Sequence, residues 1–186
     1  MDCRPVAIPL AANEKFEKDD GEKKANSSIY RSLIGSLLYL TSTRPDIMFS
    51  ASLLSRFMQE PRQVHFGATK HALRYLQGTM DYGIMYKFGG DLNLIAYFYS
   101  DWAGSTDGMK STSGYAFLFG STISSWLSKK KSFVALSTAE ADYVSTAKAT
   151  SQANCLRRIF EDIGEKQNKG IVMYCDNKSV IAIAKN

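Results

Sequence analysis

The segment that decides the fold reads SGYAFLFGSTISSWL and runs from Ser113 to Leu127. Its two halves, Ser113–Phe119 and Thr122–Leu127, are rich in the aromatic and β-branched residues that favour strands. The Gly120-Ser121 pair between them is typical of a tight hairpin connection. We therefore expect these residues to form an antiparallel hairpin.

Further strands and helices are predicted on both sides of this hairpin. In chain order they are strands at Ile84–Phe88 and Leu92–Tyr99 with Gly89-Gly90 as their connection, a long helix over Thr138–Ile163, a strand over Ile171–Cys175 and a helix from Lys178. A strand that follows a helical crossover joins a sheet in parallel. The sequence therefore predicts an α/β fold, in which flanking helices cover an antiparallel meander with one added parallel strand.

The first half of the chain has a different pattern. In residues 29–80, apolar residues recur at helical spacing in three stretches that prolines separate, which predicts a small helical module. Residues 10–28 are mostly charged and polar, too polar to offset the entropy lost on folding. The predicted organisation is a flexible leader over 1–28, the helical module over 29–80 and the α/β domain over 81–186.

Composition limits the class of protein. The 186 residues are 45% hydrophobic, which is enough for a sizeable core. No apolar run approaches the roughly 18 residues of a membrane span, so we expect a soluble intracellular protein without a membrane partner, cytoplasmic or alternatively nuclear. The three cysteines form no C-x-x-C pair, which argues against a zinc site. The net charge of +5 is compatible with a polyanionic partner.

Acidic residues occur at three places that this fold can bring together. Asp101 follows the strand at 92–99, Glu140 and Asp142 lie in the first turns of the long helix, and Asp176 follows the strand at 171–175. Strand ends and an adjoining helix share one edge of an α/β sheet. Clustered carboxylates bind Mg²⁺ or Mn²⁺, and two such ions can activate water for phosphodiester hydrolysis. The alternative is that these acids are helix caps and solvated surface groups.

The start of the long helix leaves a choice between two acids. Residues 140 and 142 are about 200° apart around a helix, so only one of them can face a metal site. The run Ser137-Thr-Ala-Glu140 matches a capping box, in which Glu140 accepts a hydrogen bond from the backbone N–H of the cap residue Ser137. This favours Asp142 for the site and keeps Glu140 as the alternative.

Eight sequence blocks occur in the order and at the spacing of a known family. They are YRSLIGSLLYLT from Tyr30, TRPDI from Thr43, LRYLQGT from Leu73, SDWAG from Ser100, KSTSGY from Lys110, ISSWLSKK from Ile123, STAEADY from Ser137 and YCDN from Tyr174. The first three resemble the end of a copia-type retrotransposon reverse transcriptase, and the other five resemble its RNase H domain. The chain also resembles domesticated copia RNase H proteins of the plant type.

The resemblance implies an RNase H fold, a two-metal site with Mg²⁺ or Mn²⁺, and cleavage of the RNA strand of a duplex. The family's first catalytic acid falls on Tyr99, and Asp101 matches the second acid of that motif. Asp142 matches the family's metal-binding glutamate, and Asp176 matches its position without substitution. The chain ends at Asn186, before the region that supplies a fourth carboxylate in the family, so we expect weak metal binding.

Two polar runs are candidate contacts to nucleic acid. Lys129, Lys130 and Lys131 follow the second strand of the hairpin, where positive charge can contact phosphates. Lys110, Ser111 and Thr112 precede its first strand and can donate hydrogen bonds to a phosphate backbone. The alternative is that both runs are ordinary solvated turns.

These observations support two functional hypotheses. The first is a metal-dependent endoribonuclease that acts on an RNA/DNA hybrid or on double-stranded RNA, with antiviral defence as a use for a domesticated copy. The second is a catalytically inactive module that binds nucleic-acid duplexes or another partner. The apolar surface left without a last helix makes a homodimer a further expectation.

Overall fold

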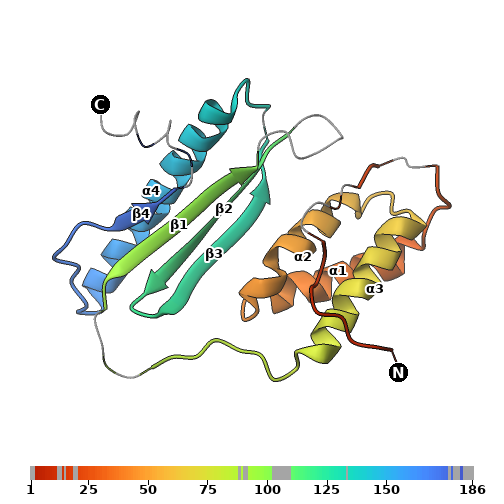
Figure 1. Cartoon of the computed structure of the whole chain (residues 1–186), viewed down its shortest axis with the longest axis horizontal. Helices are drawn as coiled ribbons and strands as arrows, with labels where there is room; N and C mark the ends of the chain where they lie inside the picture. The colour runs from red at the N-terminus through yellow and green to blue at the C-terminus, as the bar shows by residue number, and fades with distance from the viewer. Residues whose placement is uncertain are drawn as a thin grey trace. The chain divides into compact units, whose positions relative to one another are not determined.

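The computed structural model describes residues 3–11, 14, 16–18, 21–87, 89, 92–101, 110–132, 134–175, 177 and 181. They form two compact units, one before residue 85 and one after it. In Figure 1 the helices of the first unit are orange and yellow, and the strands of the second are green to blue. Within these residues, no helix combines the length and the apolar character that crossing a membrane requires.

The first unit is helical. Its elements are α1 (Ser27–Leu40), η1 (Pro45–Ile47), α2 (Met48–Leu54), η2 (Ser55–Phe57) and α3 (Gln63–Gly78). Asn26 fixes the start of α1, because its side-chain oxygen accepts hydrogen bonds from the backbone N–H groups of Ser28 and Ile29 at 3.0 and 3.1 Å. The three helical stretches expected over residues 29–80 are confirmed, and 3₁₀ turns flank the second.

Part of the expected leader packs against these helices. Leu10 and Phe16 are each only 7% exposed and belong to the same apolar core as the helices. In addition, Arg74 Nε donates a hydrogen bond to the Arg4 carbonyl at 2.7 Å. The expectation of a flexible leader over residues 1–28 is therefore corrected at Leu10 and Phe16, while most other described residues of this segment are exposed. The average polarity of the segment conceals these two apolar side chains, whose burial stabilises the contact with the helices.

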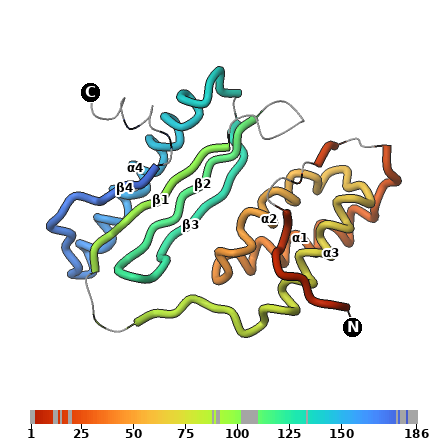
Figure 2. The backbone as a smooth tube through the Cα atoms, viewed as in Figure 1, coloured from red at the N-terminus to blue at the C-terminus, as the bar shows by residue number. Residues whose placement is uncertain are grey.

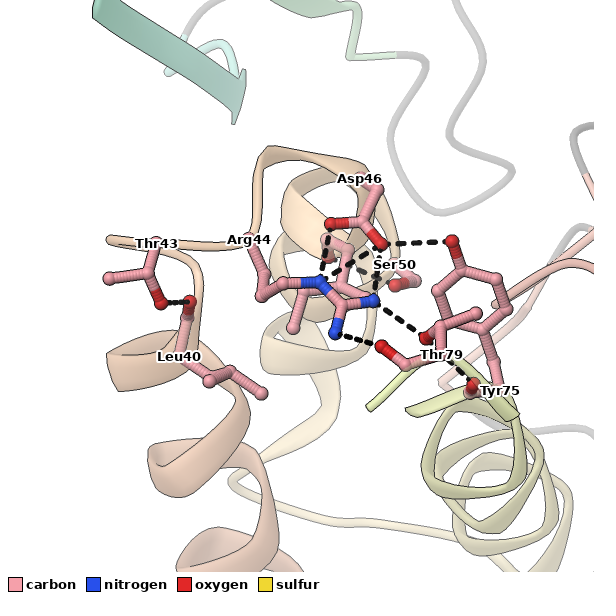
Figure 3. A network of polar contacts seen from close by, with 8 residues as sticks. Leu40, Thr43, Arg44, Asp46, Ser50, Tyr75 and Thr79 are labelled. Carbon is pink, nitrogen blue, oxygen red and sulfur yellow. Dashed lines mark hydrogen bonds and ion pairs between the residues drawn. The ribbon is translucent and has the colours of Figure 1, made fainter. Parts of the chain in front are cut away.

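An ion pair between the buried Arg44 and the more exposed Asp46 lies in the α1–α2 connection, and its hydrogen bonds reach the end of α3 (Figure 3). Arg44 is 7% exposed, and its Nη2 lies 2.7 Å from Asp46 Oδ2. Arg44 also donates hydrogen bonds to the carbonyl and hydroxyl oxygens of Thr79, and the Tyr75 hydroxyl donates to Asp46 at 2.8 Å. Burial alone would raise the pKa of Asp46, but the hydrogen bonds from Arg44 and Tyr75 give a net lowering.

The second unit is built on a four-stranded mixed sheet. Its strands are β1 (Leu94–Asp101), β2 (Thr112–Phe119), β3 (Thr122–Lys130) and β4 (Val172–Tyr174), in the order β3-β2-β1-β4. The first three strands form an antiparallel meander, whose path Figure 2 shows, and β4 pairs with β1 in parallel. The predicted mixed sheet with one late parallel strand is confirmed.

The strand expected over Ile84–Phe88 does not form. Residues 84–87 have no regular secondary structure, and residue 88 lies outside the described positions. The Met85 carbonyl accepts a hydrogen bond from the Thr122 hydroxyl at 2.9 Å, where a strand would offer it to a neighbouring backbone. The hairpin connection expected at Gly89-Gly90 lies partly outside the described residues, and the helix expected from Lys178 falls almost entirely outside them. By contrast Gly120 has a φ of 62°, as the β2–β3 turn requires.

The helix α4 (Thr138–Asp162) covers one face of the sheet. Ala153 of the helix lies in one buried cluster with Leu94, Ala96 and Phe117 of the strands. The even-numbered residues of β1 that pack in this cluster therefore face α4. The odd-numbered residues of β1 must point to the opposite face of the sheet, because side chains alternate along a strand.

Candidate functional site

The candidate residues gather at one end of the sheet, which we call the site end. Asp101 is the last residue of β1 and pairs with Thr112, the first residue of β2. Thr112 in turn pairs with Lys130, the last residue of β3. The start of α4 reaches this end too, because Lys131 contacts the carbonyl of Ala141. The sheet register therefore brings the two predicted polar runs side by side.

Asp142 lies buried at the site end. It sits in the second turn of α4 and is 7% exposed. Its Oδ2 accepts a hydrogen bond from the Asn177 side-chain amide at 2.5 Å. Asn177 follows β4, so this contact ties the start of the helix to the segment after the parallel strand. Sequence reasoning did not identify Asn177, although it directly follows the predicted site residue Asp176.

Lys131 is the second buried charged group here, at 2% exposed. Its ammonium group donates hydrogen bonds to the Ser100 hydroxyl at 3.1 Å and to the Ala141 carbonyl. Burial lowers the pKa of Lys131, and the charge of Lys148 adds to this, while the negative charges of Asp142 and Glu140 oppose it. The ammonium therefore lies within the electrostatic field of the Asp142 carboxylate.

Glu140 stabilises the start of α4. Its carboxylate accepts a hydrogen bond from the backbone N–H of Leu136 at 2.6 Å, and its own N–H donates to the Ser137 hydroxyl at 3.1 Å. The expected Ser137 cap is present, but Glu140 reaches the residue before the cap and not the cap itself. Glu140 is exposed while Asp142 is buried, so the two acids occupy different environments.

Asp101 and Tyr99 lie on the other face of the sheet from α4. Ser100 faces the helix side, since its hydroxyl contacts Lys131, and neighbouring residues on a strand alternate. Asp101 is exposed. Tyr99 is 40% exposed, and its hydroxyl lies 3.1 Å from the Ser128 hydroxyl. The Tyr99 ring packs over Gly114 of β2.

The structure describes the predicted two-metal site only in part. Mg²⁺ and Mn²⁺ need several oxygen ligands, and the hydrogen bond from the Asn177 amide is the described contact of the Asp142 carboxylate. Among the residues that the structure describes, no group of three or more His, Cys, Asp or Glu side chains could hold a metal. Asp176 lies outside them.

The predicted nucleic-acid contacts divide into accessible and buried residues. Lys129 is exposed, and Lys110 and Lys130 are partly exposed. Ser111, Thr112 and Lys131 are buried, so in this conformation they do not reach a ligand at the surface. The accessible part of the predicted interface therefore consists of three lysines on adjoining strand ends.

Comparisons with known proteins support an origin in the Pol polyprotein of copia-type retrotransposons. The chain is 39% identical over 186 residues to the retrovirus-related Pol polyprotein from transposon RE2 of Arabidopsis thaliana, which covers 100% of the chain and 13% of that relative. It is 40% identical over 192 residues to the Pol polyprotein from transposon TNT 1-94 of Nicotiana tabacum, covering 99% and 14%.

A shorter relative is the secreted RxLR effector protein 161 of Plasmopara viticola, 41% identical over 125 residues that cover 67% of this chain and 88% of that protein. The chain thus spans only 13–14% of the length of the Pol relatives named above. No family model matches it. No solved structure matches it either.

Proposed function

We propose that the second unit of this chain, which is homologous over its whole length to a part of the retrovirus-related Pol polyproteins of copia-type retrotransposons, is an RNase H-like domain that binds a nucleic-acid duplex. The binding surface is the site end of the sheet. The ligand is an RNA/DNA hybrid or double-stranded RNA, which share A-like geometry and a wide minor groove. In this proposal binding occurs without efficient hydrolysis.

One observation carries this proposal. The β2–β3 register places Lys129 opposite Ser113 and Lys130 opposite Thr112, so the two polar runs adjoin at one sheet end. Lys110 precedes β2 at the same end. Three accessible ammonium groups on neighbouring strand ends suit the phosphates of a duplex, which contribute affinity without sequence preference.

A second function has an observation of its own. The hydrogen bond from Asn177 to Asp142 connects the segment after β4 to the start of α4. Two of the acidic positions that the family uses belong to these elements, Asp142 itself and Asp176 next to Asn177 in sequence. This supports an RNase H-type endoribonuclease that uses Mg²⁺ or Mn²⁺, and antiviral defence is a use for such an enzyme.

Binding and cleavage assays on the full chain separate the two functions. Labelled RNA/DNA hybrid, double-stranded RNA and double-stranded DNA are incubated with the protein, either in chelator or in Mn²⁺. We expect binding that persists in chelator and no cut strand. Cleavage in Mn²⁺ that Asp142→Asn abolishes would establish the endoribonuclease instead, and absence of binding to every duplex would contradict both functions.

The lysine variant tests the proposed surface. Lys129→Gln with Lys130→Gln should weaken binding to all duplexes and reduce the slope of log K against log salt by roughly two. Lys166→Gln with Lys169→Gln is the matched control, because it also removes two charges and both lysines are exposed beyond the last residue of α4. An equal loss in the control would show that only the total charge matters.

A further inference from the structure

We infer that a groove in the first unit binds an acidic amphipathic helix of a partner protein. The groove has a volume of about 960 Å³, and its walls come from α1, α3 and the first residues of the chain (Figure 1). This inference concerns the first unit alone and does not depend on nucleic-acid binding by the second.

The groove follows the surface of α3. Gly67, Lys70, His71, Arg74 and Gln77 line it at spacings of three and four residues, so they form one stripe along the helix. The stripe from residue 67 to residue 77 rises about 15 Å, which is roughly three turns. A partner helix can therefore lie along it, as amphipathic helices do in other grooves.

The groove offers apolar surface to a ligand. Leu33 of α1 and Leu73 of α3 both line it, and Leu73 is 37% exposed. Gly67 has no side chain, and a Cβ added there would meet nothing within 4 Å. The groove therefore has both apolar contacts and space for the apolar side chains of a bound helix, whose burial favours binding.

The charges of the groove determine which kind of helix fits. Lys70 and Arg74 are positive, and none of the described lining residues is acidic. In the described part of the chain, neither of the two belongs to an ion pair. Arg74 Nε donates to the Arg4 carbonyl at 2.7 Å, which holds the guanidinium in place and leaves its two terminal nitrogens for a ligand. Carboxylates beside the apolar face of a bound helix would pair with these two cations.

The apolar lining also separates this ligand from nucleic acid. Phosphates and sugars bind polar and charged groups, and they gain little from contact with leucine. Apolar side chains gain from leaving water. Two unpaired cations beside an exposed leucine therefore favour an acidic amphipathic helix over a nucleic-acid strand.

Two designed peptides test the kind of ligand. Each has about 14 residues, roughly four turns of helix, with leucine at positions i, i+3, i+4 and i+7 and either glutamate or lysine at all the others. Fluorescence anisotropy of the labelled peptides, titrated with the full chain, measures their affinities. We expect the glutamate peptide to bind at least about tenfold more tightly than the lysine peptide. Absence of binding by the glutamate peptide, or equal affinity for both peptides, would overturn the inference.

A variant that fills the groove locates the binding. Gly67→Leu should weaken binding of the glutamate peptide at least about tenfold, because the new side chain occupies the space of the ligand. Gly35→Leu in α1 is the matched control, since a Cβ there also meets nothing within 4 Å and Gly35 does not line the groove. Unchanged affinity in the folded Gly67→Leu protein would contradict the inference.

A second variant tests the charges and still decides the matter if Gly67→Leu does not fold. Lys70→Gln with Arg74→Gln should weaken binding of the glutamate peptide at least about threefold, whereas Lys166→Gln with Lys169→Gln removes the same charge elsewhere and should not. Equal losses in the two double variants would overturn the inference. So would double-stranded RNA that displaces the peptide from wild type and loses affinity in Lys70→Gln with Arg74→Gln, because the groove would then be a nucleic-acid site.

Discussion

At the scale of single residues, burial decides which charged groups act inside the protein. The sequence contains two candidate acids within three positions of each other, yet Glu140 is exposed at the helix start and Asp142 is buried beneath it. The same contrast separates Lys131 from Lys129, which lies two positions earlier and is exposed. Residues of the same charge that are close in sequence can therefore differ in role, because one is buried inside the protein and the other is exposed to solvent.

The Arg44–Asp46 pair gives a prediction at this scale. The pKa of Asp46 is lowered in the folded state, so its contribution to stability is present above the unfolded pKa of about 3.9 and is lost as pH falls through the folded pKa. Asp46→Asn should reduce the stability of the first unit at neutral pH by about 0.5–1 kcal/mol, because Arg44 loses its charged partner while solvent at the exposed Asp46 screens the pair. Urea unfolding of wild type and variant between pH 7 and pH 2 measures this.

The difference between the two proteins should shrink below about pH 4 as the wild-type carboxylate becomes protonated. Glu60→Gln serves as the control, because Glu60 forms an exposed pair with Lys24 at 2.6 Å. A pH-independent difference for Asp46→Asn would mean that the pair does not supply this stability.

At the scale of elements, contacts from distant parts of the chain decide what forms. The run at 84–88 has the composition of a strand, but the backbone carbonyl of Met85 accepts a hydrogen bond from the side chain of Thr122. The segment before α1 has the composition of a leader, but Leu10 and Phe16 reach the core of the first unit. The composition of a segment therefore indicates its preferred secondary structure, and its contacts with distant residues decide whether that structure forms.

The substitution Phe16→Ala tests whether the segment before α1 contributes to the core of the first unit. Removing a buried aromatic side chain typically costs about 3–5 kcal/mol, so the first unit should be destabilised strongly. Ile8→Ala is the matched control, since Ile8 lies in the same segment and is 53% exposed. Urea unfolding followed by circular dichroism measures both variants. Equal, small effects would show that this segment does not contribute to the core.

At the scale of the whole molecule, the residues that the structure describes form two hydrophobic cores. One is formed by the helices with the segment before them, and the other by α4 and the sheet. Of these described residues, none belongs to both buried clusters. Because each core is closed within its own unit, each unit should have its own cooperative unfolding transition.

A substitution in one unit should therefore shift one transition only. Gly114→Ala probes the second unit, because an added Cβ would collide with the Tyr99 ring and lie 2.8 Å from the Leu127 carbonyl. We expect a loss of about 1–3 kcal/mol in that unit, with the transition of the first unit unchanged. Gly35→Ala in α1 meets nothing within 4 Å and should not destabilise either unit. Differential scanning calorimetry resolves the transitions, and a common shift of both would contradict their independence.

The sequence by itself determined most of the elements and the family. Periodicity and turn residues predicted the helices α1 to α4, the β1–β3 meander and the late parallel strand, because these patterns reflect local geometry and one-sided burial. The motif blocks also pointed to the acids at 101, 140 and 142. Which of these acids is buried, and what surrounds it, followed only from the tertiary structure. Burial and pairing arise between residues far apart in the chain, such as Lys131 with Ser100 and Asp142 with Asn177, and no local pattern encodes those contacts.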